Sequence, residues 1–166
     1  MTSPEQTSPE PSSSDPTTPQ RPSDPAAAAL YDALATEHAA IYGYGIVSAH
    51  STPEDNWLIA QAIARHRAQR ESLIPMLDAL SVKPPLAAPG YQLPSVVNDP
   101  TEAAQLALQM ENDSAVAWRA VLEQSADEAD RAFAVDALTQ SAILMARWQN
   151  ILGVFPATVA FPGGPE

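Results

Sequence analysis

The chain has 166 residues, a length that fits one domain with a substantial hydrophobic core. Its 20 acidic residues outnumber its 8 lysines and arginines, and the formal charge of -12 disfavours nucleic-acid and membrane-surface partners. The absence of cysteine excludes disulfides, thiolate metal sites and cysteine nucleophiles.

Residues 1–24 are predicted to form a disordered, acidic tail. The first 25 residues contain seven prolines and ten serines or threonines, with no aliphatic side chain after Met1. Such a segment cannot bury enough apolar surface to offset the entropy of ordering it. It has no basic residue before Arg21 and no apolar run, so it is not a secretory signal. We expect a soluble cytoplasmic protein, because every apolar run is far shorter than the ~18 residues of a membrane span.

Two helices are predicted in the first half of the chain. The first begins at Pro25, after the capping residue Asp24, and ends near His50. The second begins at Thr52 with a capping hydroxyl and a first-turn proline, and it ends near Leu80. Apolar or small residues recur along both segments with a helical period. The inward positions are Leu30, Leu34, Ile41 and Ser48 in the first segment, and Ile59, Ala62, Ile63, Leu73, Leu77 and Leu80 in the second.

Two further helices follow a long proline-rich connection at residues 83–98. One begins after Asp99, with Glu102 as the second half of a capping box. The other begins after a tight turn at residues 125–128 and ends at Gly153. The pattern predicts an all-α, antiparallel four-helix bundle over residues 25–153 and a proline-rich C-terminal tail over residues 154–166.

Each predicted helix has one polar residue near its middle, at a position of the apolar stripe that faces the core. These residues are Glu37, His66, Glu111 and Gln140, and Arg70 follows His66 by one turn. Because the four interruptions fall at similar depths, they predict a polar layer across the bundle. Buried carboxylates without partners are costly, so the layer must neutralise itself or bind something.

Two interpretations of this layer are open. Two carboxylates and an imidazole suit a hard or borderline metal ion, which predicts a site for one iron or manganese at Glu37, His66 and Glu111. Gln140 and Arg70 would then lie beside the ligands. Alternatively, an arginine such as Arg70 forks onto one of the glutamates while His66 bridges them, and the layer is a structural network without a cofactor.

The residues EHAAIYGYG at positions 37–45, followed by ARHR at positions 64–67, resemble the alanine-rich, actinobacterial ferritin-like family of unknown function. The resemblance covers roughly residues 26–152. It implies a ferritin-like bundle and, by descent, a di-iron pattern to which each helix contributes ligands.

Only three of the six ligand positions of that pattern are kept in this chain. Glu37 and Glu111 match the single glutamates, and His66 matches the histidine of the second helix. Non-matching residues stand at the remaining positions, which are Ile63, Gln140 and Ile143. The resemblance therefore implies a degenerate metal site.

The expected function is that of a non-catalytic structural or interaction module that forms a homodimer through a helix face. The alternative is a metal-binding ferritin-like protein or oxidoreductase that uses Glu37, His66 and Glu111. No phosphate-binding glycine loop, nucleophile elbow or Glu-x-x-His pair occurs, so the sequence gives no positive case for an enzyme.

Overall fold

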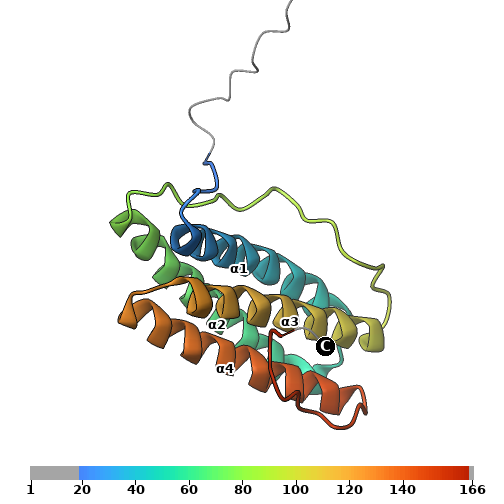
Figure 1. The fold of residues 1–166 in the computed structure, drawn as a ribbon. Helices are drawn as coiled ribbons and strands as arrows, with labels where there is room; N and C mark the ends of the chain where they lie inside the picture. The colour runs from blue at the N-terminus through green and yellow to red at the C-terminus, as the bar shows by residue number, and fades with distance from the viewer. Residues whose placement is uncertain (1–18, 165–166) are drawn as a thin grey trace, which may run out of the picture.

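The computed structural model describes residues 19–164, and all regular secondary structure in that range is helical. The helices form a four-helix bundle, which confirms the predicted fold class (Figure 1). They are α1 (Pro25–His50), α2 (Asn56–Ala79), α3 (Pro100–Gln124) and α4 (Glu128–Ile151), with a 3-10 turn, η1 (Pro53–Asp55), before α2.

Aspartate caps begin three of the helices. The Asp24 side chain accepts a hydrogen bond from the backbone N–H of Ala27 at the start of α1 (2.9 Å). Asp99 and Asp127 cap α3 and α4 in the same way. Each cap satisfies a backbone donor that the helix itself cannot, and it fixes where the helix begins.

The start of α2 differs from the prediction. The sequence predicted a helix from Thr52, but residues 53–55 form η1 and α2 begins only at Asn56. The Thr52 hydroxyl donates to the Asp55 side chain (2.9 Å) instead of capping a backbone N–H. This side-chain bond favours a tighter turn ahead of the helix.

The long crossover between α2 and α3 determines the directions of the packed helices. Helix α1 packs against α2 and α3, and α3 packs against α4. Residues 80–99, which lie between α2 and α3, run along the bundle from one end to the other (Figure 1). Because of this crossover α3 runs antiparallel to α1, and each packed pair is antiparallel (Figure 1). Among the described helices, none has the length and hydropathy of a transmembrane span.

The two ends of the chain were predicted as tails. Residues 1–18 lie outside the described part of the chain, so the predicted disorder stays a prediction for them. Arg21 pairs with Asp32 of α1 (2.6 Å). At the other end, a Cβ on Gly163 would lie 2.4 Å from the Ala115 carbonyl oxygen, so the C-terminal segment approaches α3 closely.

Two clusters of buried apolar side chains make up the core. One contains Tyr44 and Trp148, and the other contains Leu34, Leu73 and Trp118. On each of α1, α2 and α3, one buried charged or titratable residue lies between the residues of one cluster and those of the other. These residues are Glu37, His66 and Glu111. The predicted polar layer therefore lies between two apolar halves of the bundle.

Candidate functional site

Three residues of the predicted polar layer meet in the centre of the bundle. Glu37 of α1 and Glu111 of α3 are each 0% exposed, and His66 of α2 is 1% exposed. Each lies on the inward stripe of its helix, as the apolar period predicted. Because they are sealed from water, their charges must be balanced by one another and by neighbouring donors.

His66 lies between the two glutamates. Its Nδ1 donates to Glu37 Oε2 (2.6 Å), and its Nε2 donates to Glu111 Oε1 (3.1 Å). A histidine that donates from both ring nitrogens is an imidazolium. The layer is thus a carboxylate–imidazolium–carboxylate chain that links α1, α2 and α3.

Aromatic donors complete the chain at both ends. Trp118 Nε1 donates to Glu37 Oε1 (2.9 Å), and the Tyr44 hydroxyl donates to Glu111 Oε1 (2.5 Å). The Tyr44 hydroxyl in turn accepts from Trp148 Nε1 of α4 (3.0 Å). All four helices therefore contribute to one buried hydrogen-bonded network, which we call the central network: Glu37, Tyr44, His66, Glu111, Trp118 and Trp148.

The positions of Tyr44 and Trp118 follow from helix geometry. Each lies seven residues after the glutamate of its own helix, which is two turns along the same face. Side chains on a helix lean toward its N-terminus, so both aromatics lean back to the level of the polar layer. There each bonds the glutamate of the opposite helix. The seven-residue spacing from each glutamate is the sequence signal that identifies these two aromatics as network donors.

The electrostatics favour a charged His66. Burial by itself lowers the pKa of His66, but the hydrogen bonds and negative charges of Glu111 and Glu37 outweigh it and raise the pKa to about 10. At neutral pH the imidazolium therefore neutralises one of the two carboxylates. Burial and the adjacent Glu111 charge also raise the pKa of Tyr44 well above its ordinary value, which keeps the hydroxyl protonated as a donor.

Two buried oxygens beside this network have no hydrogen-bond partner. They are Glu111 Oε2 and Ser114 Oγ, one turn apart on α3. Both hydrogen bonds to Glu111 go to its other oxygen, Oε1. Glu111 Oε2 is therefore the one carboxylate oxygen of the network that accepts no hydrogen bond.

The geometry separates the predicted metal ligands rather than collecting them around one point. The two nitrogens of an imidazole face opposite directions, and each is bonded to a different glutamate. In the part of the chain that the structure describes, no three His, Asp or Glu side chains are arranged to hold an ion. Binding at Glu37, His66 and Glu111 would require the His66 ring to leave one carboxylate.

The predicted arginine fork is wrong. Arg70 lies one turn beyond His66, but its guanidinium bonds Glu71 at the surface (2.6 Å). Arg147 donates to Gln61 and lies over the Trp57 ring. Gln140, the fourth predicted member of the layer, is only half-buried, and none of the hydrogen bonds that join the central network involves it. The charge that the prediction assigned to arginine is supplied by His66.

The chain is similar to proteins whose activity is unassigned. Residues 29–166 match the model of a domain of unknown function, DUF4439. The chain is 55% identical in sequence to a conserved hypothetical protein, rv2844, from Mycobacterium tuberculosis, and it superposes on the crystal structure of that protein with a TM-score of 0.76. The match covers 82% of this chain and 96% of that one. No curated protein matches. The chain therefore belongs to the DUF4439 family.

Proposed function

We propose that this protein is a ferritin-like helical module that works by binding another molecule and not by catalysis. Two features support ferritin-like descent. A single long crossover between α2 and α3 is the connection of ferritin-like bundles. The central network also takes one glutamate from α1, one from α3 and a histidine from α2, three positions at which di-iron bundles carry ligands.

The burial of the central network supports a function without catalysis. A general acid or base must come within hydrogen-bond reach of its substrate. Glu37, His66 and Glu111 are at most 1% exposed, and both nitrogens of His66 are occupied. The strongly shifted pKa of His66 has a complete structural explanation in its two carboxylate partners. We therefore infer that the network fixes the register of the four helices.

A second candidate function is the binding of one iron or manganese ion by Glu37, His66 and Glu111. One observation favours it, namely the unpartnered Glu111 Oε2 in the core. Two carboxylates and an imidazole are chemically suitable donors for either ion. The position of the His66 ring argues against metal binding, because its two hydrogen bonds keep the carboxylates of Glu37 and Glu111 apart.

Metal analysis of the purified chain separates the two candidates. A structural network predicts substoichiometric iron and manganese, and the same thermal unfolding midpoint with Fe²⁺ or Mn²⁺ as with Mg²⁺. Mg²⁺ is the matched control because the many surface carboxylates bind divalent ions weakly. One metal per chain, with a stabilisation by Fe²⁺ or Mn²⁺ that is lost in Glu37→Ala, would establish the metal-binding function instead.

We also propose that two copies associate. The sequence predicted contact through a helix face, whereas the exposed apolar side chains favour the region after α4. Phe155 and Phe161 are 77% and 79% exposed, and Val154 is 46% exposed. Large apolar side chains exposed close together in the sequence are typical of interaction surfaces. We expect light scattering to report a dimer for the natural sequence and a monomer for Phe155→Ser/Phe161→Ser. Trp57→Ser removes an exposed aromatic side chain from the start of α2 and should leave the dimer intact. A monomeric natural chain would refute this proposal.

A further inference from the structure

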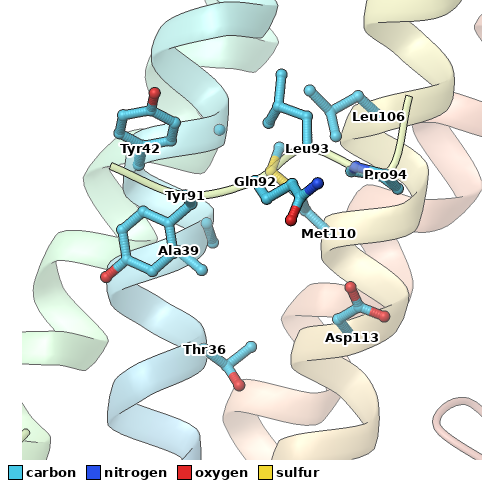
Figure 2. Close-up of a pocket in the computed structure, with 12 residues that line it drawn as sticks. Thr36, Ala39, Tyr42, Tyr91, Gln92, Leu93, Pro94, Leu106, Met110 and Asp113 are labelled. Atoms are coloured by element: carbon cyan, nitrogen blue, oxygen red, sulfur yellow. The ribbon is translucent and has the colours of Figure 1, made fainter. Parts of the chain in front are cut away.

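A groove lies between α1 and α3 where the crossover passes over them, and no residue of the central network lines it. Residues from both helices line it, and residues 91–94 of the crossover close one side (Figure 2). Its volume is about 130 Å³. An apolar cavity of about 150 Å³ binds benzene. This groove has nearly that volume and is open to solvent at its edge, so one small ring or a short branched chain can lie in it.

Small residues on α1 create the groove. Ala39, Ala40 and Gly43 face it, and none has a long side chain. A Cβ on Gly43 would lie 2.1 Å from the Met110 sulfur, so Met110 of α3 occupies the space that a larger residue would fill. The floor of the groove is therefore a flexible thioether packed on bare helix backbone, a surface that adapts to the shape of an apolar group.

The walls are apolar and aromatic. Leu93 and Pro94 of the crossover and Leu106 of α3 supply aliphatic surface. Tyr42 and Tyr91, whose ring centroids are 5.3 Å apart, stand at the α1 side of the groove (Figure 2). None of the lining residues is a lysine, arginine or histidine. Aromatic and aliphatic walls of this kind suit the apolar body of a ligand, and none of these side chains would repel a cation.

One carboxylate completes the lining. Asp113 lies one turn beyond Met110 on α3, at the solvent-exposed edge (Figure 2). Its Oδ1 accepts a hydrogen bond from Gln109 Nε2 (2.7 Å), a neutral donor that leaves the carboxylate charge uncompensated. Partial burial raises the pKa of Asp113, so its ionised form gains from a cation placed beside it.

We propose that this groove binds a small organic ammonium ion, whose nitrogen bonds the Asp113 carboxylate and whose apolar body lies on Met110 beside the two tyrosines. The proposal rests on the proposed role of the protein as a binding module, and it names the ligand class. Its test does not involve the central network. Failure to bind an ammonium ion and discovery of a bound metal are therefore separate results.

Three probes of similar size and different charge test the proposal. Benzylammonium, benzyl alcohol and benzoate are titrated into the full chain at physiological salt, and amide chemical shifts are followed by NMR. We expect benzylammonium to shift residues around Gly43, Leu93 and Met110, with an affinity at least about tenfold higher than that of benzyl alcohol, as a charge-assisted hydrogen bond implies. Benzoate should not bind. Equal binding of the alcohol, preferential binding of benzoate, or no binding of benzylammonium would overturn the proposal.

A pair of variants separates the groove from the general negative charge of the chain. Asp113→Asn should lower the affinity for benzylammonium at least about tenfold and leave that for benzyl alcohol unchanged. Asp136→Asn removes the same charge from an exposed position on α4 that does not line the groove, and it should have no effect on either probe. Equal losses in the two variants would show non-specific attraction and refute a site at Asp113.

Discussion

Replacement of His66 by leucine should destabilise the folded chain by about 3–5 kcal/mol, the range found when one partner of a buried ion pair is removed. The imidazolium is the cation between Glu37 and Glu111, and both of these side chains are sealed from solvent. Leucine would leave two carboxylates facing one another in the core. Because domains are typically stable by only about 5–15 kcal/mol, the urea midpoint should fall by a large fraction of its value.

Two further variants identify the origin of this loss. Arg70→Leu removes a positive charge one turn away on α2, where the guanidinium pairs with Glu71 at the surface, and it should change stability by less than about 1 kcal/mol. Glu37→Gln/His66→Leu/Glu111→Gln removes every charge of the network and should recover part of the stability lost in His66→Leu. If His66→Leu proves no more harmful than Arg70→Leu, the network does not hold the bundle together.

The helices were predictable because their signals are local. Asp24, Asp99 and Asp127 each bond the backbone N–H three residues on, so nearby residues determine where those helices begin. The error at Thr52 is also local. Its hydroxyl was predicted to cap a backbone N–H of the first turn, but it bonds the Asp55 side chain three residues on. The inward stripe likewise depends only on the helical period. It placed Glu37, His66 and Glu111 in the core correctly, but Ser48 and Leu80, which it also placed inward, are exposed.

The pairing inside the layer was not predictable from the stripe. Arg70 shares the face of His66 by period, but its long stem carries the guanidinium to the surface, where hydration is kept. Trp118 and Tyr44 reach the glutamates because their side chains are long and lean toward the N-terminus of their helix. A pattern of polar and apolar residues does not contain this information. The groove depends on the path of residues 91–94 over α1 and α3, and a crossover without regular structure leaves no periodic signal.

The stability of the natural chain should fall as the pH rises from about 7 to 10. The pKa of His66 is about 10 in the folded chain, against an ordinary value of 6.5. Below pH 6.5 both the folded and the unfolded states hold the proton, and the network contributes fully. Between these two pKa values only the folded state keeps it, so the free energy of unfolding decreases by up to about 1.4 kcal/mol per pH unit. Above pH 10 the contribution is lost.

Urea denaturation at intervals from pH 6 to pH 10 measures this slope, and NMR of the imidazole nitrogens shows its cause. We expect both ring nitrogens of His66 to remain protonated at pH 8, and Glu37→Gln/Glu111→Gln to flatten the pH profile because the bonds that raise the pKa are removed. His38 is a useful internal reference, since burial lowers its pKa and its ring should be neutral at the same pH. A neutral His66 at pH 8 would mean that the core holds two carboxylates without a compensating cation, and it would return a metal ion to consideration as their partner.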